Sequence, residues 1–222
     1  MSNALPNLQQ LELGYLGYDF STSTSKKFAD GEEPDENKAR NSANAISYDI
    51  DMISNFTKLR VLKLDNAPMN GSYPFLFNFP LLSKLTVSNC DYLKLGLGVL
   101  AGFPLLKEFR CQGNTRMTGN VSSLRVLKDT LEKVIINNCP HIEGNFMDLA
   151  DFPQLKFLNL HRMKTITGDI RGMGATSFPK LESLGLPENV YGGDNYKIMR
   201  VSDSKVKRTS RITAAFRHRA HR

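Results

Sequence analysis

The feature that most constrains this chain is a six-residue pattern, Leu-x-x-Leu-x-Leu, that recurs along most of its length. Its second and third leucine positions hold apolar residues or, once, cysteine. After a first gap of 51 residues, the copies follow one another at intervals of 23 to 26 residues. A repeated period of this size indicates a solenoid, in which each repeat contacts only its neighbours. The seven copies begin at Leu8, Leu59, Leu82, Leu106, Leu131, Leu155 and Leu181.

The alternation inside each copy predicts a short strand that buries its leucines on one face. Such a strand is too short to be stable alone, so we expect consecutive copies to pair as a parallel sheet. A second half-motif, such as Met117-x-Gly119-x-Val121, follows most copies, with Leu95 in place of the glycine in one of them, and returns the chain along the opposite side. We expect its glycine to have a positive φ angle or a close neighbour. A Phe-Pro pair such as Phe178-Pro179 should then end the unit.

The long first gap predicts an insertion and not an additional repeat. Ile46, Ile50, Ile53 and Phe56 have the spacing of a second half-motif, so the excess is the polar segment 17–43. This segment has little to bury, and we expect a loop there. We therefore predict a repeat domain of about seven units over residues 1–195.

Positive charge is concentrated at the end of the chain. The formal net charge is +7, and nine Lys and Arg residues face one acid, Asp203, within residues 196–222. We predict that 196–222 is a basic, disordered C-terminal tail. Nucleic-acid association through this tail is a minor alternative function, because basic segments attract polyanions.

The complete unit, Phe-Pro-x-Leu-x-x-Leu-x-Leu-x-x-(Asn/Cys)-x-x-Ile-x-Gly-x-Ile, resembles the leucine-rich repeat. Residues 117–121 and 166–170 are similar to the plant-type subclass of receptor-like proteins, although the plant-type proline after Gly-x-Ile is absent. The resemblance covers roughly residues 5–195. It implies an α/β horseshoe solenoid with a parallel sheet of short strands on the concave face. The convex side should hold irregular turns and 3₁₀ or short helical pieces. The resemblance leaves the ligand open.

No group of side chains has the spacing of a catalytic or metal site. We find no nucleophile with a base and an orienting group, and no phosphate-binding loop. We therefore predict that the chain is not an enzyme and uses no cofactor, metal or small-molecule substrate. The cysteines should be buried, reduced thiols, and Cys90 and Cys139 lie two repeats apart, too far for a disulfide. A bridge between Cys90 and Cys111 stays open, and His141 is expected in a loop.

The informative positions are those that point outward beside the leucines of each strand. They form a shallow, mixed-polarity surface, which suits a protein or peptide partner better than a small molecule. Phe157, Arg110 and His161 are the candidate anchors. The candidate partner-binding residues of the concave face are Lys63, Asp65, Arg110, Gln112, Ile135, Asn137, Phe157, Asn159 and His161.

The sequence favours a non-catalytic scaffold for protein–protein interaction through this face. The alternative is a fragment of a cell-surface receptor-like protein, which the glycosylation sequons at Asn55, Asn70 and Asn120 support weakly. The chain shows no secretory signal and no run of about 18 apolar residues. A cytoplasmic location is therefore the default expectation, and an extracellular one applies if the N-terminus is truncated.

Overall fold

The computed structural model describes residues 5, 7–14, 48–67, 69–70 and 79–191. The polar loop expected at 17–43 and the basic tail expected at 196–222 both lie outside the described residues. They remain predictions.

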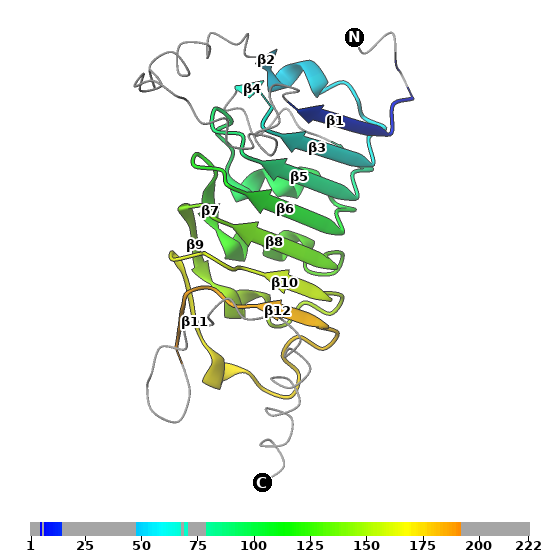
Figure 1. The fold of residues 1–222 in the computed structure, drawn as a ribbon. Helices are drawn as coiled ribbons and strands as arrows, with labels where there is room; N and C mark the ends of the chain where they lie inside the picture. The colour runs from blue at the N-terminus through cyan, green and yellow to red at the C-terminus, as the bar shows by residue number, and fades with distance from the viewer. Residues whose placement is uncertain (1–4, 6, 15–47, 68, 71–78, 192–222) are drawn as a thin grey trace, which may run out of the picture.

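Seven short strands form one parallel sheet, in which each strand pairs with the strands of the neighbouring repeats. Figure 1 shows them side by side as a ladder that runs from the N-terminal to the C-terminal end of the repeats. The first strand pairs directly with the strand that follows the long gap in the sequence. In order across the sheet, the strands are β1 (Gln10–Gly14), β3 (Val61–Asp65), β5 (Lys84–Ser88), β6 (Glu108–Gln112), β8 (Lys133–Asn137), β10 (Phe157–Asn159) and β12 (Ser183–Gly185).

The register of this sheet aligns the apolar positions of successive repeats, which confirms the parallel stack that the repeat predicts. The second leucine positions face one another from strand to strand without a slip, and all but the first are buried. Burial of these side chains against the next repeat is the main stabilising term available to such short strands. The aligned residues are Leu11, Leu62, Leu85, Phe109, Val134, Leu158 and Leu184.

The second half-motif forms a further parallel sheet, which the sequence analysis did not predict. His141, expected in a loop, is the first residue of one of these strands. Across this sheet the order is β13 (Asn189–Tyr191), β11 (Ile166–Asp169), β9 (His141–Asn145) and β7 (Thr118–Asn120). In β7, for example, the side chains of Met117 and Val121 on either side of the strand are buried in the core, and the backbone between them pairs with β9 of the next repeat. A small pair, β2 (Tyr48–Asp49) and β4 (Met69–Asn70), lies near the N-terminal end.

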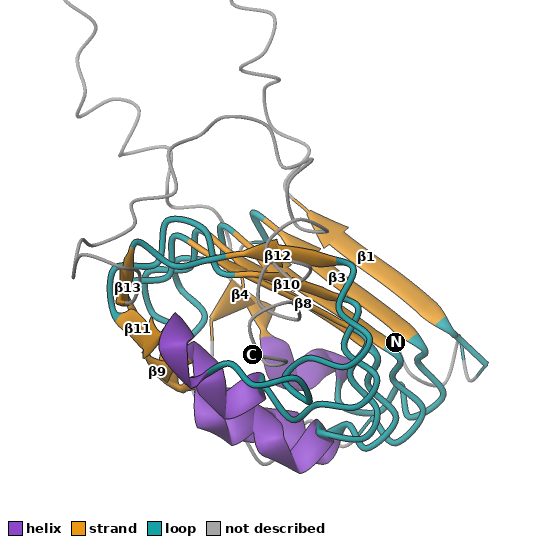
Figure 2. Cartoon of the chain, turned by 90° about the horizontal axis from the view of Figure 1, so that it is seen from below, coloured by secondary structure: helices purple, strands orange, loops and turns teal. Residues whose placement is uncertain are grey.

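Short 3₁₀ helices follow β7, β9 and β11 of this second sheet, and two more occur earlier in the chain. Figure 2 shows them on the side of the molecule opposite the seven-stranded sheet. The residue after the recurrent glycine caps three of these helices: Asn120, Asn145 and Asp169 each accept a hydrogen bond from the backbone N–H two residues on. The helices are η2 (Ile50–Ile53), η4 (Leu97–Gly102), η5 (Val121–Leu127), η6 (Phe146–Leu149) and η7 (Ile170–Gly172).

The recurrent glycine is required by close approach between repeats, as expected. Gly144 has a φ of +125°, and a Cβ atom there would lie 2.8 Å from Cγ2 of Val121 in the preceding repeat. An L side chain at this position would meet both an unfavourable backbone and a steric clash.

Polar atoms buried between the repeats are satisfied by a side chain of the next repeat. Asn114 is buried, its Nδ2 donates to the carbonyl of Val87 at 2.7 Å, and its Oδ1 accepts from the N–H of Cys90 at 2.9 Å. Met163 stands at the equivalent place two repeats later, where the Asn or Cys of the resembled pattern is missing. Its Sδ accepts from the N–H of Cys139 at 3.5 Å, so the sulfur takes part of that role.

Adjacent residues of the central strand β6 test the inward and outward assignment. Phe109 is buried and Arg110 is exposed. Phe109→Ala should lower the free energy of unfolding by about 3–5 kcal/mol, because it opens a cavity between repeats. Arg110→Ala should lower it by less than about 0.5 kcal/mol. Denaturant unfolding of the two variants measures both values, and equal losses would contradict the assignment.

Candidate functional site

The nine predicted partner-binding residues lie on four strands of the seven-stranded sheet and just beyond it. They alternate with buried core residues, so they point to the side of the sheet away from the core, here called the open face. His161 follows β10 by two residues, and its backbone N–H donates to Oδ1 of Asn159 at 3.0 Å. The others are Lys63 and Asp65 on β3, Arg110 and Gln112 on β6, Ile135 and Asn137 on β8, and Phe157 and Asn159 on β10.

The sheet register brings most of these residues together in rows. Arg110, Ile135 and Asn159 are direct neighbours across β6, β8 and β10. Gln112 and Asn137 form the next row on β6 and β8. Lys63 and Asp65 are separated from these rows by one strand, β5, which contributes Thr86 and Ser88.

A further row of the open face was missed by the sequence analysis. It holds Lys84, Glu108, Lys133 and Phe157, which are aligned in register across β5, β6, β8 and β10. Only Phe157 was predicted as part of the site. The same alternation that placed Arg110 outward also places Glu108 outward, so the period of two was the signal that could have found this row.

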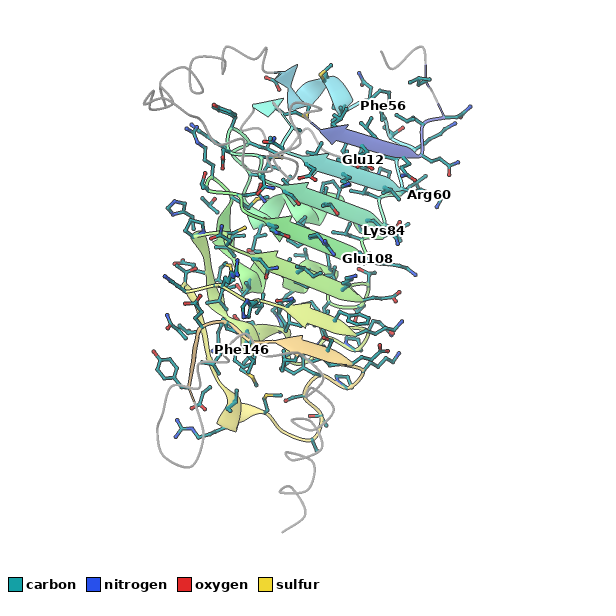
Figure 3. The ribbon with its side chains drawn as sticks, viewed as in Figure 1. Glu12, Phe56, Arg60, Lys84, Glu108 and Phe146 are labelled. Carbon is teal, nitrogen blue, oxygen red and sulfur yellow. The ribbon has the colours of Figure 1, made fainter. Side chains whose placement is uncertain are left out.

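Charges on the N-terminal half of the open face neutralise one another across neighbouring strands. Lys84 and Glu108 form an ion pair of 2.9 Å, and Figure 3 shows both residues at the same side of their strands. Lys63 of β3 pairs with Glu12 of β1, and its hydrogen bond to that carboxylate raises the pKa of Lys63. Exposed pairs of this kind contribute little stability, but they leave little net charge for a ligand.

The centre of the open face differs, because its cations have no carboxylate partner in the part of the chain that the structure describes. Arg110 is exposed and makes no hydrogen bond or ion pair with the described residues. The Nζ atom of Lys133 lies 5.6 Å from the ring centre of Phe157, a cation–π contact. Together with the half-buried Ile135, these residues form what we call the cationic patch: Arg110, Lys133, Ile135 and Phe157.

The open face is shallow. A depression of about 190 Å³ lies over β1, β3, β5, β6 and β8, and its lining includes Lys63, Arg110 and Ile135 of the predicted set. Small-molecule sites are usually larger and more enclosed, with volumes of about 300–1,000 Å³. The shape therefore suits side chains of an extended ligand better than an enclosed small molecule.

Other chemistry has little support in the described part of the chain. Within these residues, no group of three or more His, Cys, Asp or Glu side chains is arranged to hold a metal ion. The same residues contain no helix with the length and apolar character needed to cross a membrane.

An ion-pair ladder runs through the turns that precede β6, β8 and β10, beside the open face. Glu132 lies between Lys107 at 3.3 Å and Lys156 at 2.8 Å. Hydrogen bonds from Lys156 and Lys107 lower the pKa of Glu132. The carboxylate form is therefore favoured by the fold, and its stabilisation is present above the ordinary glutamate pKa of about 4.3.

This ladder predicts a pH-dependent effect. Glu132→Gln should lower the free energy of unfolding at pH 7 by less than about 1 kcal/mol, because the pairs are exposed. The difference from the unmodified protein should disappear as the pH falls through the lowered pKa, and it should shrink in high salt. Thermal unfolding between pH 7 and pH 2 measures this. Glu143→Gln, which changes an exposed carboxylate without an ion pair in the described residues, is the control. Equal effects of the two substitutions would contradict the role of the ladder.

Comparison with solved structures found several similar chains, and two plant receptor proteins are among them. The crystal structure of the Arabidopsis receptor kinase HAESA, in complex with the peptide hormone IDA and the co-receptor SERK1, matches with a TM-score of 0.51 and 19% identity. The match covers 66% of this chain and 24% of that chain. The LRR ectodomain of the receptor kinase GASSHO1/SCHENGEN3 from Arabidopsis thaliana, in complex with CASPARIAN STRIP INTEGRITY FACTOR 2, matches with a TM-score of 0.45 and 19% identity. That match covers 66% of this chain and 20% of that one.

The chain thus spans a quarter or less of the length of these two proteins. No family model matches the sequence, and no curated protein matches it. At 19% identity, the likeness to the HAESA structure concerns the fold alone. Together with the aligned parallel strands, it shows that this chain has the fold of a plant-type leucine-rich-repeat solenoid.

Proposed function

We propose that this chain is a non-catalytic binding module whose open face holds an extended segment of a peptide or protein. The observation that carries the proposal is the cationic patch, where Arg110 and Lys133 lie beside two apolar side chains and have no carboxylate partner among the described residues. Everywhere else on the sheet, most charges are already paired. If the solenoid curves as a horseshoe with the open face on its concave side, the aligned side chains of this face would lie closer to the ligand.

The size of the face favours a segment over a whole protein surface. Seven strands at a spacing of about 4.8 Å give a sheet roughly 29 Å long, and a five-residue strand is roughly 16 Å wide. This area of roughly 450 Å² is about half of the roughly 800 Å² that each partner buries in a standard protein–protein interface. An extended peptide laid across the strands would fit within it.

The chemistry of the cationic patch indicates what the segment carries. The exposed guanidinium of Arg110 can make two parallel hydrogen bonds to a carboxylate of the ligand. Lys133, on the neighbouring strand β8, would attract the same carboxylate. Ile135, next to Arg110, and Phe157, next to Lys133, offer apolar contacts to the same ligand. We therefore propose a partner segment with acidic residues next to an apolar side chain.

The test is peptide selection against the full chain, followed by affinity measurements. We expect the selected peptides to be rich in Asp and Glu next to apolar residues, and Arg110→Glu to weaken their binding at least tenfold. The matched control is Arg116→Glu, the same change at an exposed residue outside the seven-stranded sheet. An equal loss in the control would show a general charge effect. Selected peptides that bind Arg110→Glu normally would contradict the proposal.

A second candidate is a fragment of a receptor-like protein that recognises an extracellular ligand. The likeness to HAESA supports it, because that receptor kinase was solved with a peptide hormone. Asn55 of the first sequon is exposed, whereas Oδ1 of Asn120 is engaged in capping η5. Sugar on Asn55 of the natural protein would favour this candidate over an intracellular scaffold. Nucleic-acid association remains a prediction that rests on the tail.

A further inference from the structure

Two of the three cysteines lie in contact inside the core. Cys111 belongs to β6, and Cys139 follows β8 by two residues. Both side chains are fully buried, and their Sγ atoms are 3.4 Å apart. A disulfide bond is about 2.05 Å long, so the sulfurs touch as free thiols and would need to approach by roughly 1.4 Å to bond.

The fold makes this pair specific. Cys90 and Cys139 occupy the same position two repeats apart, and Asn114 occupies that position in the repeat between them. Nδ2 of Asn114 donates to Sγ of Cys111 at 3.1 Å, while Sγ of Cys90 donates to the carbonyl of Ser88. The disulfide pairs considered from the sequence all include Cys90. The contact of Cys111 with Cys139 could not be read from the spacing, because it joins two different positions of consecutive repeats.

We propose that Cys111 and Cys139 are a modification site, at which a disulfide joins two consecutive repeats when the chain meets a small-molecule disulfide such as oxidised glutathione. The thiolate of Cys139 attacks the small-molecule disulfide, which forms a mixed disulfide and releases one thiol. Cys111 then loses its proton to solvent and attacks Sγ of Cys139, which releases the second thiol. Two protein thiols are oxidised, and one small disulfide is reduced to two thiols.

The surroundings of the two sulfurs support this order of events. The two sulfurs form a hydrogen bond in which either thiol can donate, and this hydrogen bond lowers the pKa of Cys139. The same hydrogen bond, together with burial, raises the pKa of Cys111. Cys139 is therefore the thiol that more readily becomes a nucleophilic thiolate. Because both sulfurs are buried, the reaction takes place during folding or during local opening of the two repeats.

The disulfide would act on stability and leave the open face unchanged. It would close a loop between residues 28 positions apart and tie β6 to the turn after β8. Both sulfurs lie in the core, on the side of the sheet opposite Arg110. The inference is therefore independent of the proposed peptide binding, and each can fail without the other.

The test uses the full chain, purified with its three thiols reduced and then equilibrated with mixtures of reduced and oxidised glutathione. We expect two thiols to be lost together, peptide mapping to find Cys111 joined to Cys139, and the Tm to rise by roughly 5–10 °C. Cys90→Ala should keep this behaviour, and Cys111→Ala should abolish it.

Three outcomes would overturn the proposal. These are retention of all three thiols in fully oxidising mixtures, a bridge that contains Cys90, and a glutathione adduct on Cys139 that Cys111 does not resolve. The mapping is made on the unmodified protein, so its result does not depend on whether a cysteine variant folds.

Discussion

The contact between one repeat and the next is the interaction on which every other feature of this chain depends. Each strand of the main sheet is three to five residues long and could not stay folded alone. Hydrogen bonds to both neighbours satisfy the backbone of each inner strand, and its inward side chains complete a continuous apolar column. Even a buried polar side chain such as Asn114 finds its partners in the preceding repeat.

This dependence on neighbours divides the side chains into two groups with different roles. The inward residues and the close approach at Gly144 hold the repeats together, so they tolerate little change. The outward residues do not pack between the repeats, so they can differ from one repeat to the next. On the open face, adjacent-strand ion pairs neutralise one half, and Arg110 and Lys133 give the centre a different character. A stack of similar units thus presents a face that is chemically uneven.

The main sheet could be predicted because its signal repeats: six of the seven copies follow at nearly equal intervals, which leaves only one register that aligns Leu62, Leu85, Val134 and Leu158 in one column. The second sheet was not predicted, because its half-motif has a glycine between only two apolar positions. Such a pattern also fits a turn. The contact of Cys111 with Cys139 joins two different positions of consecutive repeats, which the repeat spacing alone does not give.

Native-state hydrogen exchange of the strand amides tests the central claim, that neighbouring repeats carry the stability, most directly. If they do, amides of β5, β6 and β8, which are bonded on both sides, should exchange slowest. Amides of β1 and β12, which have one partner strand each among the described residues, should exchange markedly faster. Uniform protection across all seven strands, or the strongest protection in β1, would contradict the account.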